Sequence, residues 1–164
     1  MPDDTPDAVL KEVLEKSRTI AMIGASTNPI RPSLFVATYL NGRGRRVIPI
    51  NPAQVGQTLF GEPVLAGLAD IPAGTEVDMV DIFRRSEAVP DIVDEALGTL
   101  LPHLTCIWMQ YGVRHEQAAA KARAASVVVI EDRCPKVEHM RLIGGTNLAG
   151  LGGGAISSKL PRST

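Results

Sequence analysis

Small and polar residues directly follow an apolar run near the start of the chain. The run occupies residues 19–23, and a helical segment begins soon after the turn. The turn consists of Gly24, Ala25, Ser26, Thr27 and Asn28. A helix N-terminus at the end of a parallel strand offers unpaired N–H groups and a positive dipole end, and small residues let a diphosphate approach the backbone. The pattern therefore predicts that this turn binds the phosphates of a nucleotide.

This turn differs from the glycine-rich fingerprint of nicotinamide-dependent dehydrogenases. In the pattern G-x-G-x-x-G, Ser26 and Pro29 occupy positions that should be glycine, and Pro29 has no N–H to donate to a phosphate. Asn51 ends the second apolar run, where such enzymes carry an acidic residue that binds the ribose hydroxyls. The residues thus indicate a ligand other than an ordinary nicotinamide cofactor.

Basic residues gather where the predicted strands end. Arg31 follows the first strand, Arg84 and Arg85 follow the third, and Arg133 and Lys136 follow the fifth. These positions share the carboxyl edge of a parallel sheet with the predicted helix N-terminus, an arrangement that suits a polyanion. The alternative is that these cations only face water. The other residues at this edge are small or polar, and they include Asn51, Gln110 and Gly112.

The bulk composition excludes several classes of function. The chain has 164 residues, which is long enough for one domain with its own core. Its net charge is −1, with both signs mixed along the chain, so we expect no nucleic-acid partner. No apolar run approaches the roughly 18 residues of a membrane span, and the first residues do not resemble a signal peptide, so we expect a cytoplasmic protein. Cys106 and Cys134 have neither disulfide nor metal-ligand spacing, and no metal site is predicted.

Five short apolar runs predict the strands, at residues 19–24, 47–50, 77–83, 105–109 and 127–130. Helical patterns lie between most of them, and one of these helices should begin at Pro32 with Phe35 on its buried side. We also expect an N-terminal helix capped by Thr5 and a short last helix from Pro135. Buried strands that alternate with helices predict an α/β, Rossmann-like doubly wound fold, a mostly parallel five-stranded sheet in a three-layer αβα arrangement. Right-handed crossovers with one reversal favour the order 3-2-1-4-5, with the crevice at the carboxyl ends of strands one and four.

A change in composition divides the chain near its end. We expect residues 1–143 to form the Rossmann-like domain. Residues 144–164 combine many glycines with serine and threonine and few large apolar side chains. We expect this segment to be a flexible tail, or one that becomes ordered against a protein partner.

Five sequence blocks, taken in order, resemble one family. They are IAMIGAS at 20–26, VIPINP at 47–52, VDMVDIFRR at 77–85, WMQYG at 108–112 and DRCPKVEH at 132–139. Together they resemble the stand-alone coenzyme A-binding proteins, which are similar to the N-terminal domain of the succinyl-CoA synthetase α subunit. The resemblance spans roughly residues 8–143. It implies a Rossmann-like fold with coenzyme A as the cofactor, bound across the carboxyl edge of the sheet.

The resemblance also implies roles for single residues. The phosphates would meet Gly24, Ala25, Ser26 and Asn28, the nucleotide would lie along Asn51 and Pro52 between Phe83 and Arg84, and the pantetheine arm would meet Gln110 and Gly112. The family relative carries its phosphorylated histidine in a second domain that has no counterpart in this sequence, so ligase activity is not implied. A lysine is typical of the synthetases in the loop after strand two, whereas Ala53 and Gln54 stand here.

Cys134 leaves two interpretations open. It follows strand five among Arg133 and Lys136, cations that would lower the pKa of its thiol and make it reactive toward the coenzyme thiol. Alternatively it is a packed, inert cysteine. We further expect His115 to be solvated at a helix start, and His103 to lie favourably at the end of a helix dipole.

These observations predict a binding or regulatory module for coenzyme A or an acyl-CoA, with no catalytic residues of its own. The small-molecule ligand is the expected partner, and a protein partner is open. Two alternatives belong to the enzymes: a nucleotide-dependent oxidoreductase, and the coenzyme A-binding part of a multi-subunit acyl-CoA enzyme.

Overall fold

The computed structural model describes residues 3–144. The predicted glycine-rich tail therefore lies, apart from Gly144, outside the described residues. The division into residues 1–143 and 144–164 stays a prediction.

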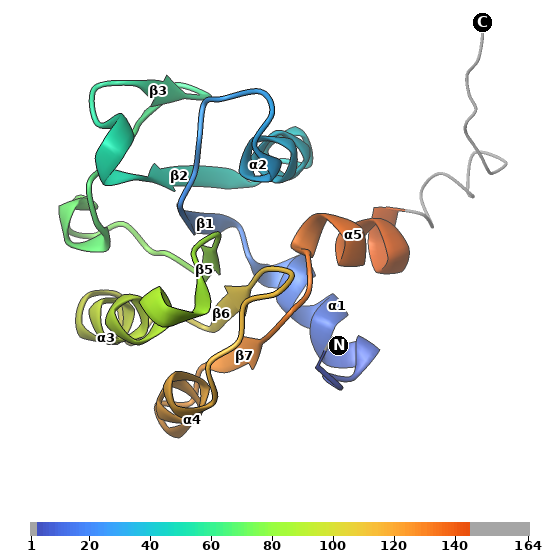
Figure 1. Ribbon diagram of the computed structural model, residues 1–164. Coiled ribbons are helices and arrows are strands. Elements are labelled where there is room, and N and C mark those ends of the chain that lie inside the picture. Colours follow the sequence, from blue (N-terminus) through green and yellow to red (C-terminus); the bar gives the residue numbers. More distant parts are fainter. Residues whose placement is uncertain (1–2, 145–164) are drawn as a thin grey trace, which may run out of the picture.

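A parallel sheet of five strands forms the centre of the molecule (Figure 1). Its strands are β1 (Thr19–Ile23), β2 (Arg46–Ile50), β5 (Met79–Ile82), β6 (Cys106–Met109) and β7 (Val128–Ile130). Nearly every strand residue is buried, because helices cover both faces of the sheet. The predicted α/β fold with a five-stranded parallel sheet is confirmed.

Two helical layers bury the two faces of the sheet. The first layer contains α1 (Asp7–Lys16), α2 (Pro32–Gly42) and α5 (Pro135–His139), which continues as a π-helical turn at Met140–Gly144. The second layer contains α3 (Val89–Leu100) and α4 (Glu116–Ala124). Each layer has its own apolar cluster with one face of the sheet. All strands end on the same edge, so the loops after β1, β5 and β6 meet there (Figure 1).

The strand order is β2-β1-β5-β6-β7, so the predicted order 3-2-1-4-5 is wrong. Counting the five sheet strands along the chain, the order is 2-1-3-4-5, and the third strand, β5, pairs with β1. Both orders obey the rule of right-handed crossovers with one reversal, so that rule could not choose between them. The point where the strand order reverses consequently lies between β1 and β5, and not between strands one and four.

The outer edge of β2 explains why the third strand cannot pair there. The segment after β2 forms a small antiparallel hairpin of β3 (Thr58–Leu59) and β4 (Glu62–Pro63). Leu65 then donates its N–H to the carbonyl of Pro49 at 2.9 Å and accepts one from Asn51 at 2.8 Å. These bonds occupy the edge positions that a neighbouring strand would need.

Two local predictions at helices are also wrong. Helix α1 begins at Asp7 with Pro6 as its N-cap residue, and no side chain caps it, whereas Thr5 was expected to do so. Phe35 was expected on the buried side of α2, but 56% of it is exposed, and the buried positions are Ser33, Val36, Ala37 and Leu40. Among the helices within residues 3–144, none is both long and apolar enough to cross a membrane.

Candidate ligand-binding crevice

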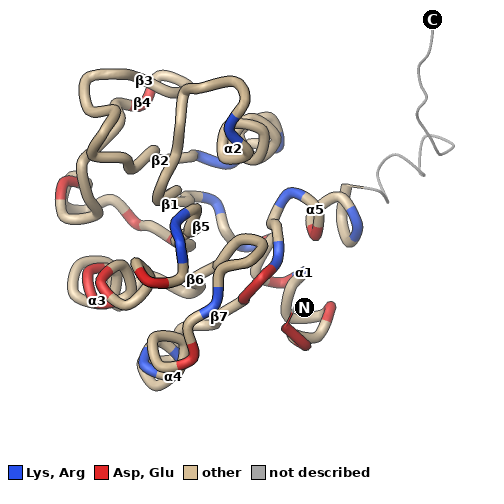
Figure 2. Tube along the Cα trace, in the orientation of Figure 1, with Lys and Arg blue, Asp and Glu red and all other residues tan. Residues whose placement is uncertain are grey.

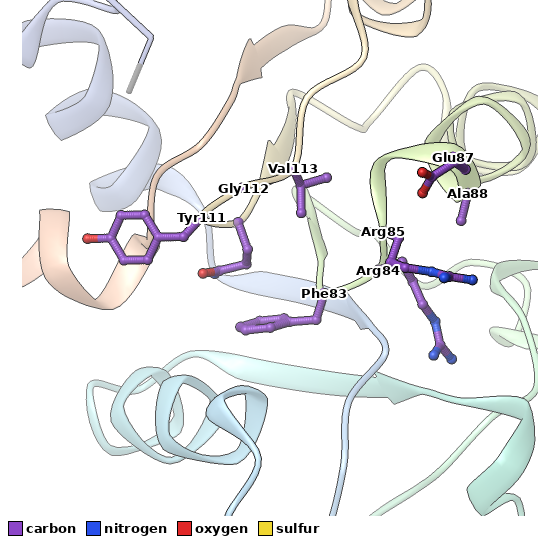
Figure 3. Close-up of a pocket in the computed structure, with 9 residues that line it drawn as sticks. Phe83, Arg84, Arg85, Glu87, Ala88, Tyr111, Gly112 and Val113 are labelled. Atoms are coloured by element: carbon purple, nitrogen blue, oxygen red, sulfur yellow. The ribbon is translucent and has the colours of Figure 1, made fainter. Parts of the chain in front are cut away.

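Two cavities meet at the carboxyl edge of the sheet, and we call them the small and the large cavity. The small cavity, about 300 Å³, is lined by Gly24, Ser26, Asn28, Arg31, Asn51, Ala53, Gln54, Phe83 and Arg84. The large cavity, about 710 Å³, is lined by Phe83, Arg84, Arg85, Glu87, Ala88, Gln110, Tyr111, Gly112 and Val113 (Figure 3). Phe83 and Arg84 line both, so the two form one crevice across the ends of β1, β5 and β6.

Gly24 lets the loop after β1 pack closely on the end of β5. Its φ is +84°, and its N–H donates to the carbonyl of Ile50 at 2.8 Å. A Cβ at this position would overlap the carbonyl oxygen of Phe83. Glycine is therefore required at this position for backbone packing. A substitution by valine would disturb the fold, so it cannot serve as a clean test of binding.

Residues of the loop after β2 hold the rest of the turn in place. The Ser26 hydroxyl accepts from the Asn28 N–H at 3.0 Å and from Gln54 Nε2 at 3.2 Å. Thr27 donates its N–H to Gln54 Oε1 at 3.0 Å, and its hydroxyl to Gln57 Oε1 at 2.6 Å. Ser26 and Asn28 line the small cavity, whereas Thr27 does not line it and is held to the loop after β2 by its bonds to Gln54 and Gln57. Ala25, also predicted in the site, is only 1% exposed and lies beneath the turn.

Asn51 connects three parts of the small cavity. Its Nδ2 donates to the carbonyl of Ala25 at 2.8 Å, and its Oδ1 accepts from the Ala53 N–H at 2.9 Å. Arg84 Nη2 lies 3.4 Å from the same Oδ1. An aspartate could not make the first of these bonds, because a carboxylate has no donor. Pro52, predicted beside Asn51, starts an exposed 3₁₀ turn and does not line either cavity.

The N-terminus of α2 opens beside the small cavity. Arg31 is its N-cap residue, no side chain caps the helix, and Pro32 occupies the first position. The Ser33 hydroxyl is buried and has no hydrogen-bond partner among the described residues. The positive end of this helix dipole and its first-turn N–H groups favour an anion at the crevice.

The predicted cluster of basic residues divides into two groups. Arg31, Arg84 and Arg85 lie at the crevice, and within residues 3–144 the side chains of Arg31 and Arg85 have no hydrogen bond or ion pair. Figure 2 shows basic positions along the trace directly after β5 and at the start of α2. The side chains of Arg84 and Arg85 extend to the same side, away from Tyr111 (Figure 3). Unpaired guanidinium groups at this edge are available to an anionic ligand.

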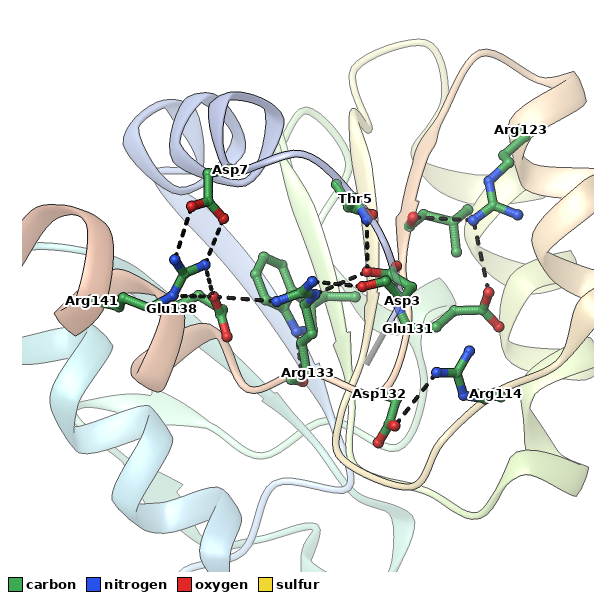
Figure 4. Close-up of polar contacts among 12 residues, drawn as sticks. Asp3, Thr5, Asp7, Arg114, Arg123, Glu131, Asp132, Arg133, Glu138 and Arg141 are labelled. Atoms are coloured by element: carbon green, nitrogen blue, oxygen red, sulfur yellow. Dashed lines mark hydrogen bonds and ion pairs between the residues drawn. The ribbon is translucent and has the colours of Figure 1, made fainter. Parts of the chain in front are cut away.

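Arg133 is structural, contrary to the expectation that it faces the ligand. Its Nε donates to Asp3 Oδ1 at 2.9 Å, its Nη2 donates to the Asp3 carbonyl at 2.6 Å, and Glu138 lies 3.5 Å away (Figure 4). Glu138 also accepts from Arg141, which binds Asp7. The network joins the N-terminal segment to α5, so the charge of Arg133 is neutralised inside the protein.

Cys134 lines neither cavity. It is 5% exposed at the N-cap of α5, and burial raises the pKa of its thiol, although the N–H groups of Val137 and Lys136 oppose that shift. The charge of Lys136 does lower the pKa of this thiol, as expected, but burial outweighs it, and Arg133 is paired with Asp3, so the net shift is upward. The packed interpretation of Cys134 fits these observations.

Two predicted residues of the loop after β6 line the large cavity in different ways. Gly112 has a φ of +77°, and its N–H is used by Asp132 Oδ1 at 2.6 Å. This bond holds the pKa of Asp132 below its usual value. Gln110 is 6% exposed, and its Nε2 donates to Asp81 Oδ1 at 3.1 Å. Burial raises the pKa of Asp81, which is fully enclosed, to about 7.

The sequence interpretation missed several residues of the crevice. Glu87, Ala88, Tyr111 and Val113 line the large cavity, and Ala53 and Gln54 line the small one. Only their positions in the sequence could have indicated these residues, because all of them lie shortly after the end of a predicted strand. Two histidines have partners that the sequence did not indicate: His115, at the start of α4, caps that helix by accepting from the Ala118 N–H, and His103, shortly after the end of α3, lies 2.7 Å from Asp78 at the edge of the sheet opposite the crevice.

The chain is similar to known proteins in its sequence. A family model described as CoA binding domain matches residues 18–140. The uncharacterized protein YneT of Bacillus subtilis is 35% identical over 132 residues, which cover 80% of this chain and 93% of that protein.

Two solved structures share the fold closely. Cell-free ID.343 from Thermus thermophilus has a TM-score of 0.78 and 37% identity, with coverage of 85% of this chain and 100% of that one. A hypothetical protein from Pyrococcus horikoshii OT3 has a TM-score of 0.77 and 29% identity, with coverage of 86% and 94%.

Proposed function

Because this chain belongs to the CoA-binding domain family, we propose that it binds coenzyme A or an acyl-CoA along the crevice, as a binding or regulatory module. Residues 18–140, which the family model matches, include every residue that lines the two cavities. Cys106 and Cys134 are both free and buried, which fits a reducing compartment such as the cytoplasm.

The single observation that carries this proposal is that the two cavities adjoin at Phe83 and Arg84, which line both of them. Coenzyme A has an anionic nucleotide end and a long uncharged pantetheine arm. The small cavity offers the N-terminus of α2 with Arg31 and Arg84, which suits phosphates. The large cavity offers the amide of Gln110 and the apolar surface of Val113, which suit the arm.

The oxidoreductase alternative is disfavoured by Asn51. A nicotinamide dinucleotide needs a free acceptor for its ribose hydroxyls at the end of β2. Asn51 is 8% exposed, and its two amide atoms already bind Ala25 and Ala53. The third possibility, a subunit of an acyl-CoA enzyme, uses the same crevice and differs in needing a protein partner.

Calorimetric titration with coenzyme A, NAD and NADP tests the proposal. We expect coenzyme A to bind at least about ten-fold more tightly than either dinucleotide, a difference of about 1.4 kcal/mol. Equal or tighter binding of a nicotinamide dinucleotide would contradict the proposal. Non-denaturing mass spectrometry of the purified protein supplies a second measurement, because a retained ligand is identified by its mass.

A further inference from the structure

Asp81 is a buried carboxyl group with an unusually poor set of partners. It lies in the centre of β5, is 0% exposed, and is in register with Met22 of β1 and Trp108 of β6. Gln110 Nε2 lies 3.1 Å from one carboxyl oxygen and 3.5 Å from the other. Within residues 3–144 no other group donates a hydrogen bond to the carboxyl group of Asp81, and this carboxyl has no ion pair. A buried carboxylate normally requires a cation or several donors.

The surroundings of Asp81 do not compensate its charge. On this face of the sheet α1 and α2 contribute apolar side chains such as Leu10 and Val36. The titratable groups that interact with Asp81 are the thiols of Cys106 on β6 and Cys134 before α5. Burial raises the pKa of both thiols, and the charge of Asp81 raises them further, so both stay neutral near pH 7. In the described part of the chain, Gln110 is the residue whose side chain hydrogen-bonds the Asp81 carboxyl, so its amide senses the proton of Asp81 directly.

Gln110 connects this buried acid to the crevice. Its side chain lines the large cavity, and its Nε2 is directed to Asp81. In the described part of the chain no group donates to Gln110 Oε1, and this oxygen is not among the buried atoms that lack a partner. It is therefore an acceptor that a ligand in the large cavity can reach.

We propose that Asp81 is a positioning residue whose proton decides which end of the Gln110 amide faces the ligand, and thereby whether the crevice favours free coenzyme A or an acyl-CoA. This inference rests on the proposed function, with the thiol end of the ligand over Gln110. Ionised Asp81 can only accept, so it holds Nε2 inward and leaves Oε1 for a donor such as the S–H of the free thiol.

A proton taken up from solvent reverses this arrangement. Protonated Asp81 donates its O–H to Gln110 Oε1 once the amide turns over, and Nε2 then faces the cavity as a donor. The thioester carbonyl of an acyl-CoA accepts from that donor, whereas the free thiol has no carbonyl. Burial places the pKa of Asp81 at about 7, so the exchange falls in the physiological range.

Binding of three probes at about pH 6 and about pH 8 tests the inference. The probes are coenzyme A, acetyl-CoA and adenosine 3′,5′-bisphosphate, which lacks the arm. We expect the preference for acetyl-CoA over coenzyme A to rise about three- to ten-fold at the lower pH, as one hydrogen bond allows. The affinity for the bisphosphate, corrected for ionisation of its phosphates, should not change with the protonation state of Asp81.

Two variants test whether Asp81 orients the Gln110 amide or only supports the fold. Asp81→Asn removes the titration, and the change of preference with pH should disappear. Gln110→Met should abolish this change as well, whereas Gln117→Met, at an exposed position of α4, should behave like the parent protein. Chemical shifts of the Gln110 side-chain NH₂ in the ligand-free parent protein should titrate near pH 7, a readout that needs no variant to fold.

The outcomes distinguish the two proposals. If the probes bind but the preference does not change with pH, or the Gln110 NH₂ does not titrate, the inference is wrong and the binding function stands. If Asp81→Asn folds and keeps the full pH profile, Asp81 is not the group responsible. If the parent protein binds none of the three probes, the proposed function is wrong and this inference falls with it.

Discussion

The amide nitrogen of Asn51 lies 2.8 Å from the carbonyl oxygen of Ala25, and this bond fixes the turn after β1 to the turn after β2. The Oδ1 atom of the same side chain accepts from the Ala53 N–H at 2.9 Å. One buried amide thus sets the shape of the small cavity from both sides. The residue type follows from this requirement for a donor and an acceptor on one short side chain.

Asn51→Asp should therefore weaken both the fold and the binding of coenzyme A. The carboxylate cannot donate to Ala25, so two acceptors face each other in a buried place, at a cost of about 1–3 kcal/mol. Urea unfolding and calorimetric titration measure the two effects. Asn41→Asp, at the exposed end of α2, is the matched control. An Asn51→Asp variant as stable as the parent would show that the amide donor is dispensable.

Arg84→Ala should weaken coenzyme A binding by about 1–3 kcal/mol if the guanidinium meets a phosphate in the small cavity with little water between them. A contact that is open to solvent would cost less than about 1 kcal/mol and would weaken with salt. Titrations at low and high salt separate the two cases. Arg18→Ala at the opposite edge of the sheet is the control. No effect at either salt concentration would assign Arg84 to the solvated surface.

The stability of the protein should fall as the pH rises from about 4 to about 7 because of Asp81. Its pKa is 3.8 when exposed and about 7 in the fold, so the unfolded chain releases the proton first. Asp81 contributes fully to the free energy of unfolding below about pH 4. This contribution decreases between about pH 4 and about pH 7, and it does not change further above that pH. The full decrease is on the order of 4 kcal/mol. Urea unfolding of the parent and of Asp81→Asn across this range checks it, and parallel profiles would refute it.

The Asp3–Arg133 pair should stabilise the docking of the N-terminal segment. Both side chains are largely buried, and although burial opposes it, the Glu131 N–H and the Arg133 guanidinium hold the pKa of Asp3 below its usual value. The contribution of Asp3 to the free energy of unfolding is therefore present above about pH 4 and is lost as the pH falls further. Asp3→Asn should cost about 1–3 kcal/mol at neutral pH. Thermal unfolding measures this, with Asp4→Asn as the exposed control, and equal losses in the two variants would contradict it.

The fold class could be predicted because it follows from local patterns. Each strand is a short apolar run, and Pro32 and Pro135 mark helix starts that the structure also has. The strand order could not be predicted, because it depends on whether the segment after β2 covers the edge of that strand. Leu65 makes the bonds that decide this, and nothing in its local sequence indicates them.

Some features of the candidate site could likewise be predicted from the sequence, and others could not. Strand ends predict which loops meet, so Gly24, Asn51, Arg84 and Gln110 lie along one crevice. Sequence position cannot show what a charged side chain binds. Arg133 has the same kind of position as Arg84, yet an acid more than a hundred residues away, Asp3, neutralises it.

Mapping the bound ligand on the protein tests the central claim most directly. Backbone amide chemical shifts should be recorded while coenzyme A is added to uniformly ¹⁵N-labelled protein. We predict that the largest changes fall on Ser26, Asn28, Arg84 and Gln110, around the two adjoining cavities. Arg18 and His103 at the opposite edge should stay unchanged. Saturable changes confined to Arg18 and His103, or no changes at all, would contradict the account.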